Sequence, residues 1–276
     1  MNEKKFNYNI ILISTGAVVI FISLIISLTI SFVANLSLNQ NRPVSVDNPT
    51  KVDIVILSES SCSDCFNLTP VIDSIKAENV KIKSEKAVYI STKDGQELLA
   101  KYNITKIPSL LVSGDFNKND GLNLLFSKWG EIIDKTFVLR QIGAPYFEVE
   151  TSKVRGQVQL TMLVDTECSQ CYDVNKHEAI LKQYGFVDND SKVLNITLDE
   201  GKALIDKYNI KLLPTIVLTG DLDAYPSLIK AWLQVGTVES DGTYIFRDGV
   251  KQMGVYKDIS TGEIITPQPK VTPNQQ

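Results

Sequence analysis

The four cysteines of this chain form two C-x-x-C pairs that occupy the same position of an internal repeat. Cys62 and Cys65 form the first pair, and Cys168 and Cys171, 106 residues further on, form the second. Pro108 and Pro214 are separated by the same 106 residues, so each proline follows the first cysteine of its pair by 46 residues. A repeat that carries both the cysteines and the prolines predicts two copies of one folded unit.

The similarity of the two units extends well beyond the cysteines. The segment KYNITKIPSLLVSGD, from Lys101, aligns without gaps to KYNIKLLPTIVLTGD, from Lys207, with seven identical residues in fifteen. In the segment before it, Gly95 corresponds to Gly201. Agreement over this length, in register with the cysteines, excludes a chance resemblance between the two C-x-x-C motifs.

The length of the chain fits two such units. A chain of 276 residues has room for about two domains of ordinary size, each with its own core. The repeat places the two units at residues 51–144 and 145–262. Residues 263–276 are rich in proline and polar side chains, which predicts a disordered tail.

The N-terminal part of the chain has a different composition. Residues 10–33 contain no charge, and as a helix these 24 residues would be about 36 Å long at roughly 1.5 Å per residue. A transmembrane helix is therefore predicted, because the hydrocarbon core of a bilayer is about 30 Å thick. Residues 1–9 then form a stub and residues 34–50 a polar spacer. A cleavable signal peptide is the alternative, although its apolar stretch usually has only about 7 to 15 residues.

The residues that flank the apolar segment bear on its orientation. Lys4 and Lys5 precede it, and Arg42 and Lys51 follow it, so positive charge barely favours a cytoplasmic N-terminus. A short stub with its charges close to the span is typical of a signal anchor. We therefore predict a single-pass membrane protein with its soluble units outside the cytoplasm.

Each cysteine pair lies between a predicted strand and a predicted helix. VDIVIL, before the first pair, is short, apolar and rich in β-branched residues, whereas the residues after the pair show apolar side chains at helical spacing. The C-x-x-C is thus expected on the first turn of the helix, where free amides and the helix dipole favour a thiolate on the first cysteine. Cys62 and Cys168 are the expected attacking thiols, and Cys65 and Cys171 the resolving thiols that close a redox-active disulfide.

Each unit resembles a thioredoxin-like domain, and the tandem arrangement resembles the two-unit protein disulfide oxidoreductases. Strand, C-x-x-C, helix, strand, helix, proline and two further strands follow one another in the order of that fold. The resemblance implies an α/β fold class, with a central mixed sheet flanked by helices in each unit. It also implies that Pro108 and Pro214 are cis prolines facing the cysteines, and that the backbone of Ile107 and Leu213 pairs with an extended substrate segment.

The chain departs from this family at several positions. The buried acid that the family has six residues before the first cysteine is replaced by Ile56 and Met162. No final helix is visible in either unit, because APYFEVETSKVRG and GVYKDISTGEII have the pattern of hairpins. Trp129 and Trp232, in an extra segment between the last two strands of each unit, are expected to be core residues.

Charge and motifs exclude several classes of function. With 28 basic and 32 acidic residues and a formal net charge of −4, the chain is not expected to bind nucleic acid. It contains no Gly-rich phosphate loop, no nicotinamide or flavin motif and no Ser/His/Asp signature, so no cofactor is predicted. His177 is the only histidine and is expected to be a solvated helix residue, which gives histidine acid–base chemistry little support.

Thiol:disulfide exchange is the function that these observations favour. Glu59 and Asp64 flank the first pair, and Asp165 and Glu167 flank the second. Negative charges raise the pKa of a thiol, so a reductase or isomerase is expected rather than a strong oxidase. The expected partners are thiols and disulfides of exported proteins, together with a redox protein in the membrane that recharges the pairs. Because the residues between the cysteines differ, the two pairs are expected to differ in potential.

Two other functions stay open from the sequence alone, a non-catalytic peptide-binding module and a zinc-binding protein. A binding module would not need its cysteines, yet both pairs are intact. Two cysteine pairs on separate repeat units do not have the spacing of a zinc ribbon, so no metal site is predicted. As a purely structural bridge, a C-x-x-C disulfide would contribute only about 2 kcal/mol, because its loop is so short.

Overall fold

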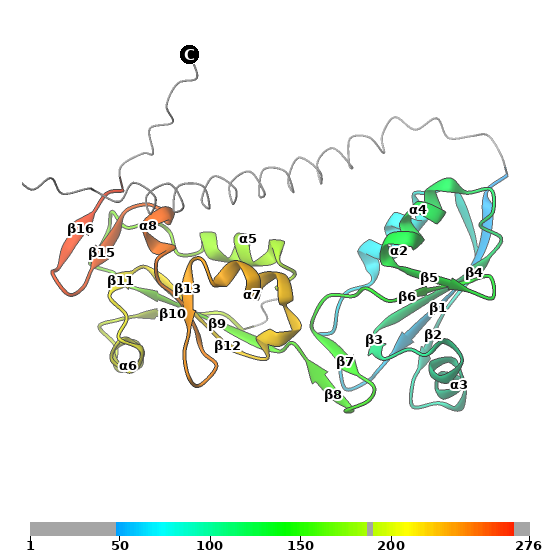
Figure 1. Cartoon of the computed structure of the whole chain (residues 1–276), viewed down its shortest axis with the longest axis horizontal. Coiled ribbons are helices and arrows are strands. Elements are labelled where there is room, and N and C mark those ends of the chain that lie inside the picture. The colour runs from blue at the N-terminus through cyan, green and yellow to red at the C-terminus, as the bar shows by residue number, and fades with distance from the viewer. Residues whose placement is uncertain (1–47, 187–189, 268–276) are drawn as a thin grey trace, which may run out of the picture. The chain divides into compact units, whose positions relative to one another are not determined.

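A computed structural model describes residues 48–186 and 190–267 of the chain (Figure 1). The predicted stub at 1–9, the transmembrane helix at 10–33 and most of the spacer and of the tail lie outside the described residues. Within residues 48–186 and 190–267, no helix is both long enough and apolar enough to cross a membrane.

The first half of the described chain is built on a five-stranded mixed sheet. Its elements are β1 (Thr50–Ser58), α2 (Thr69–Lys76), β2 (Val80–Tyr89), α3 (Lys93–Tyr102), β3 (Lys106–Ile107), β4 (Ser109–Gly114), α4 (Asp120–Trp129), β5 (Gly130–Ile133), β6 (Thr136–Leu139), β7 (Tyr146–Glu148) and β8 (Lys153–Arg155). The strand order is β2-β1-β4-β6-β5, with β2 parallel to β1 and the other neighbours antiparallel. Strands β3, β7 and β8 form a separate antiparallel sheet.

The second half repeats this plan. Its elements are β9 (Val158–Val164), α5 (Lys176–Gln183), β10 (Lys192–Asn195), α6 (Asp199–Tyr208), β11 (Leu212–Leu213), β12 (Thr215–Gly220), the 3₁₀ helix η1 (Leu222–Ala224), α7 (Pro226–Trp232), β13 (Gly236–Val238), β14 (Tyr244–Phe246), α8 (Val250–Met253), β15 (Tyr256–Asp258) and β16 (Glu263–Ile265). The main sheet has the order β10-β9-β12-β14-β13, and the small sheet has the order β11-β15-β16. Each strand order matches that of the first half, position for position.

These sheets confirm the predicted fold class. Both halves have an α/β, thioredoxin-like fold with a mixed central sheet, and in both the C-x-x-C segment connects the interior strand β1 or β9 to the next helix. The predicted hairpins at the end of each unit are also confirmed, as β7–β8 and β15–β16. The expectation that no helix follows the last strand of the main sheet was wrong for the second unit, where the short helix α8 lies between β14 and β15.

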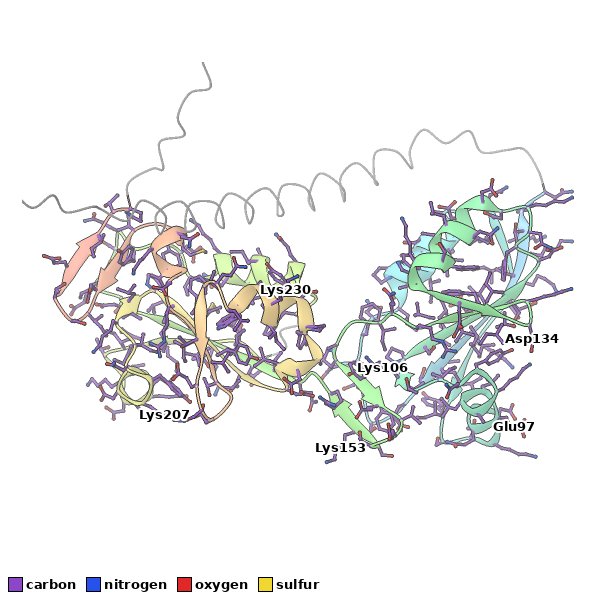
Figure 2. The ribbon with its side chains drawn as sticks, in the orientation of Figure 1. Glu97, Lys106, Asp134, Lys153, Lys207 and Lys230 are labelled. Atoms are coloured by element: carbon purple, nitrogen blue, oxygen red, sulfur yellow. A yellow bond between two sulfur atoms is a disulfide. The ribbon has the colours of Figure 1, made fainter. Side chains whose placement is uncertain are left out.

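Helices cover both faces of the first sheet, as Figure 1 shows. Alternate residues of β1 point to opposite faces: Ile54 packs in the cluster that α2 and α4 complete, and Leu57 packs in the cluster that α3 completes. Charged side chains such as Glu97 on α3 and Lys207 on α6 lie on the outside of the helices (Figure 2). This separation of apolar and charged positions is what fixes each helix against its sheet.

A glycine sets the distance between helix and sheet edge in both halves. A Cβ atom on Gly95 in α3 would lie 2.2 Å from the carbonyl oxygen of Tyr89, and one on Gly201 in α6 would lie 2.4 Å from that of Asn195. Neither position could take a side chain without moving backbone. Gly95 and Gly201 therefore correspond in the sequence because each half contains the same close contact between a helix and a strand end.

The two tryptophans belong to the cores, as predicted. The side chain of Trp232 is buried in the main cluster of the second half. That of Trp129 is partly buried and packs against the cluster formed by α2, α4 and the first sheet.

Candidate redox sites

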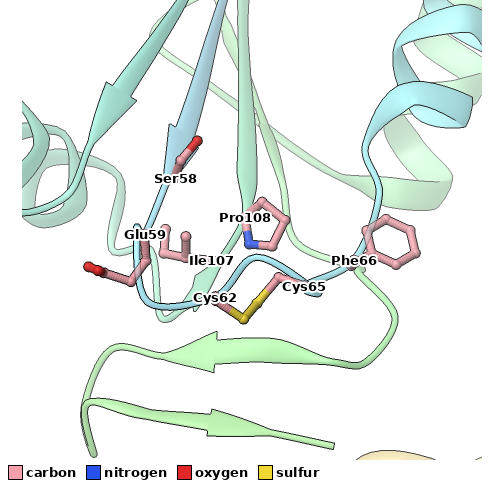
Figure 3. Close-up of a pocket in the computed structure, with 7 residues that line it drawn as sticks. All are labelled: Ser58, Glu59, Cys62, Cys65, Phe66, Ile107 and Pro108. Atoms are coloured by element: carbon pink, nitrogen blue, oxygen red, sulfur yellow. A yellow bond between two sulfur atoms is a disulfide. The ribbon is translucent and has the colours of Figure 1, made fainter. Parts of the chain in front are cut away.

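The first cysteine pair lies beside the proline that the sequence placed with it. Cys62 and Cys65 form a disulfide with a Cα–Cα distance of 5.3 Å, in the segment between β1 and α2. The Ile107–Pro108 peptide bond is cis. The disulfide and this proline line one pocket of about 130 Å³. Figure 3 shows its lining residues, Ser58, Glu59, Cys62, Cys65, Phe66, Ile107 and Pro108. The fold thus brings residues 46 positions apart into one site.

The second pair repeats the arrangement. Cys168 and Cys171 form a disulfide with a Cα–Cα distance of 5.4 Å, and the Leu213–Pro214 peptide bond is cis. The Sγ of Cys171 lies 3.8 Å from the carbonyl oxygen of Leu213, the residue that precedes the proline. Cys168 is buried, with 7% of its surface exposed, whereas Cys171 is half-buried.

Neither cysteine pair lies on a helix, so the prediction that the C-x-x-C occupies a first helical turn was wrong. The next helices begin only at Thr69 and Lys176. Before each helix an Asx turn forms: the side-chain oxygen of Asn67 accepts from the amide of Thr69, and that of Asp173 accepts from the amide of Asn175. Such turns compete with helical hydrogen bonds and delay the start of the helix. The helix dipole therefore gives the cysteines no direct stabilisation as thiolates.

A strand of the terminal hairpin runs beside each site. Ile107 pairs with Phe147 of β7, and Leu213 pairs with Lys257 of β15, in antiparallel registers. The resemblance to two-unit disulfide oxidoreductases implies that the backbone of Ile107 and Leu213 pairs with an extended substrate. In the structure the partner of that backbone is the chain itself.

The residue just before each of these hairpin strands accepts a hydrogen bond from the residue that follows the cysteine pair. The amide of Phe66 donates to the carbonyl oxygen of Pro145 at 2.7 Å, and the amide of Tyr172 donates to that of Val255 at 2.8 Å. Each C-x-x-C segment is therefore tied to the residue just before β7 or β15.

An ion pair lies beside the second cysteine pair. The Nζ of Lys257 is 2.6 Å from Oδ2 of Asp165, whose backbone carbonyl accepts from the amide of Cys168. Burial alone would raise the pKa of Asp165, but the Lys257 ammonium and the amide of Glu167 together hold it below its usual value. Lys257 was not a predicted site residue, because 92 residues separate it from Asp165 and nothing local signals the contact.

The first site lacks this ion pair. Glu59 is the counterpart of Asp165, and Phe147 takes the register position of Lys257. The pKa of Glu59 is lowered chiefly because the amide of Ser61 donates to its carboxylate at 3.1 Å. The negative charge of Glu59 is therefore held by neutral donors, whereas that of Asp165 is balanced by a cation.

His177 is buried rather than solvated, which corrects the expectation from its helical position. Only 2% of its surface is exposed, and its ring packs edge-on against Phe246. The hydroxyl of Tyr172 donates to the carbonyl oxygen of Pro214 at 2.7 Å and lies 3.0 Å from Nε2 of His177. Because that hydroxyl has only one proton, Nε2 must be the donor to it. Burial lowers the pKa of His177 to about 4 and keeps the ring neutral.

The first half has no equivalent of this hydrogen-bonded group. Phe66 stands in the place of Tyr172 and Val71 in the place of His177, at the same 106-residue offset. The two sites thus share their scaffold and differ in the polar groups that surround the cysteines.

Within residues 48–186 and 190–267, no group of three or more His, Cys, Asp and Glu side chains has the arrangement of a metal site. All four cysteines take part in the two disulfides.

Comparison with known proteins finds a similarity over part of the chain. The family model of thioredoxin matches residues 32–132. No curated protein shows a significant match. Among solved structures, the NTD_N/C domain of alkylhydroperoxide reductase AhpF from Enterococcus faecalis is 14% identical, with 64% of this chain and 86% of that chain covered and a TM-score of 0.20. Human ERp44 is 10% identical, with 68% and 52% covered and a TM-score of 0.15. Similarity at these TM-scores carries no argument about function.

Proposed function

We propose that this protein is a thiol:disulfide oxidoreductase, anchored in a membrane by residues 10–33, that exchanges disulfides with exported proteins. The observation that carries the proposal is that a C-x-x-C disulfide lies beside the Ile107–Pro108 or Leu213–Pro214 segment, on two copies of one thioredoxin-like scaffold. A disulfide kept only for stability would gain little from so short a loop.

The chemistry needs only the two thiols of each pair. In the reduced protein the thiolate of Cys62 attacks one sulfur of a substrate disulfide, and the other substrate sulfur leaves and takes up a proton. Cys65 then loses its proton and attacks the mixed disulfide, which releases the second substrate thiol. The substrate gains two electrons and two protons, and the Cys62–Cys65 pair is oxidised to its disulfide. Cys168 and Cys171 act in the same way in the second unit.

We infer that the two pairs have unequal potentials. Glu59 and Asp64 leave negative charge beside the first pair, which disfavours a thiolate, whereas Lys257 balances Asp165 beside the second. The thiolate of the second pair is therefore the more stable of the two, which stabilises the reduced form of that pair. A pair with a more stable reduced form is more oxidising, so the second pair is the more oxidising one. Electrons would then pass from the first pair to the second. Both pairs are proposed to act as reductase or isomerase sites.

The membrane anchor sets the expected partners. The chain has no nicotinamide or flavin motif of its own, so a redox protein in the same membrane is proposed to recharge its thiols. The soluble units are proposed to lie outside the cytoplasm, where protein disulfides form.

The two alternatives are less well supported. Zinc bound by all four cysteines would need both pairs at one site, whereas the two pairs belong to separate repeat units and do not have the spacing of a zinc ribbon. A module that binds peptides through the backbone before each proline would need the groups of Ile107 and Leu213, and these residues are paired with β7 and β15.

The experiment is disulfide reduction by the full-length protein in detergent, with insulin and cystine as separate substrates. Cys62→Ser/Cys65→Ser and Cys168→Ser/Cys171→Ser variants are each compared with a variant that lacks all four cysteines. We expect each two-cysteine variant to keep part of the activity. Activity of the wild type no higher than that of the cysteine-free variant would refute the proposed function.

A further inference from the structure

In the strand that leads into each cis proline, the edge that carries the backbone groups of Ile107 or Leu213 is closed by the chain's own hairpin. In the first half the amide of Val149 donates to the carbonyl oxygen of Thr105 at 2.9 Å, and Ile107 faces Phe147 two residues further along the ladder. Hydrogen-bonded pairs alternate in an antiparallel ladder, so Ile107 also occupies a bonded position. Its N–H and C=O groups are thus directed at β7 and not at solvent.

The second half closes the same edge in the same way. The amide of Ile259 donates to the carbonyl oxygen of Lys211 at 2.9 Å, and Leu213 faces Lys257 two residues further on. The closure is therefore a property of both units.

Strand β7, which pairs with Ile107, is held in place by further hydrogen bonds and by buried side chains. On its other edge β7 pairs with β8, and the side chains of Tyr146 and Phe147 are buried. The bond from the Phe66 amide to Pro145 holds the chain at the start of β7 beside the cysteines. Lifting β7 would break two ladders and expose two aromatic rings to water.

What stays open at the first site is a small pocket. Figure 3 shows β7 passing close to the Cys62–Cys65 disulfide, with Ser58 and Glu59 on another side of the pocket. This pocket has a volume of about 130 Å³ and gives access to the disulfide beside Pro108. A sulfur on a short arm can reach the disulfide through the pocket, whereas an added strand would need the backbone groups of Ile107, which already pair with β7.

We infer that the Cys62–Cys65 pair exchanges with disulfides carried on a short arm, as in cystine or at the tip of a protein loop, and not with polypeptide added as a strand to β3. This inference rests on the proposed function and narrows its substrate class. The attacking thiolate of Cys62 forms a bond to one sulfur of the small disulfide, and the other sulfur leaves as a thiol. Cys65 completes the two-electron exchange as described above.

The test uses the full-length protein with Cys168→Ser/Cys171→Ser, so that only the first pair reacts. Its reduced form is mixed with cystine, with a folded protein that carries a loop disulfide, and with a linear peptide whose disulfide lies in an extended segment. We expect the first two substrates to react at least about tenfold faster than the peptide, because only the peptide needs a free strand edge. Equal rates for the linear peptide and cystine would overturn the inference.

A second readout follows the hairpin itself. With Cys65→Ser added, Cys62 is trapped as a mixed disulfide with cysteine or with the peptide, and amide hydrogen exchange is measured at Val149 and Ile107. We expect both amides to stay as protected in the peptide adduct as in the cysteine adduct. Loss of protection in the peptide adduct alone would show that β7 moves aside as a strap. If no substrate reacts above the cysteine-free control, the proposed function fails instead, so the two failures are distinguishable.

Discussion

Lys257 and Asp165 form an ion pair that ties the hairpin strand β15 to the loop just before Cys168. Their Nζ and Oδ2 atoms are 2.6 Å apart, and Lys257 faces Leu213, the residue before the cis proline. Lys257 therefore lies on β15, the strand that pairs with β11, and from there its ammonium group contacts Asp165 beside the second cysteine pair.

Replacing Lys257 by methionine should make the second pair less oxidising. The variant leaves the buried carboxylate of Asp165 without its counter-charge, which raises the pKa of the nearby thiol and disfavours the reduced state. We expect the potential of the Cys168–Cys171 pair to become more negative by on the order of 30 mV, while that of the first pair stays unchanged. Glutathione titration followed by alkylation and mass spectrometry reads each pair separately.

Two further variants serve as controls for that prediction. Lys211→Met removes an exposed lysine near the same strand and should leave both potentials unchanged. Lys257→Met/Asp165→Asn removes both charges and should restore the potential toward the wild-type value. A second pair that does not respond to the loss of Lys257 would contradict the electrostatic explanation.

The buried His177 should make stability depend on pH. Its pKa is about 4 in the folded protein and about 6.5 in the unfolded chain, so between these values the unfolded chain binds the additional proton. The free energy of unfolding therefore falls as the pH decreases through this window, by at most roughly 3 kcal/mol. His177→Val, which installs the residue of the first half, should remove this part of the pH dependence.

Chemical denaturation near pH 7 and near pH 4.5 tests this prediction. For each protein, the free energy of unfolding near pH 4.5 is subtracted from that near pH 7. This difference is then compared between the wild type and His177→Val, because a loss of packing in the variant lowers its stability equally at both pH values and cancels. Identical pH dependence in the two proteins would mean that His177 takes up its proton in the folded state without cost.

Gly95→Ala should destabilise the first half more than its helix propensity suggests. Alanine favours a helix over glycine by about 1 kcal/mol, but its Cβ would meet the carbonyl oxygen of Tyr89 at 2.2 Å. Overpacking of this kind costs about 1 to 3 kcal/mol, so we expect a net loss of stability in thermal or urea unfolding. Glu97→Ala, at an exposed position of the same helix, should change stability by less than about 0.5 kcal/mol. An equal or higher stability of Gly95→Ala would show that α3 can move away from the sheet.

The sequence predicts the scaffold well because the scaffold is local and repeated. Strand patterns such as VDIVIL, the glycines at 95 and 201 and the final hairpins all depend on short segments, and the repeat shows each of them twice. Residues that are the same in both units are most simply explained by a role in the fold, and the identical strand order of the two main sheets agrees with this.

The features that the sequence did not predict depend on contacts between distant segments. His177 is buried because Phe246, from a strand 69 residues away, packs against it. Lys257 reaches Asp165 only because the hairpin folds back beside the site. The late start of the helix after Cys65 follows from one side-chain turn at Asn67, which a periodic apolar pattern does not reveal.

A redox titration of both cysteine pairs in the full-length protein tests the proposed disulfide exchange most directly. We expect each pair to exchange two electrons reversibly with a thiol buffer, at potentials well below the roughly −120 mV of strong oxidants. We also expect the potential of the Cys168–Cys171 pair to be less negative than that of the Cys62–Cys65 pair. Pairs that cannot be reduced and reoxidised reversibly, or potentials near −120 mV for both, would contradict the proposal.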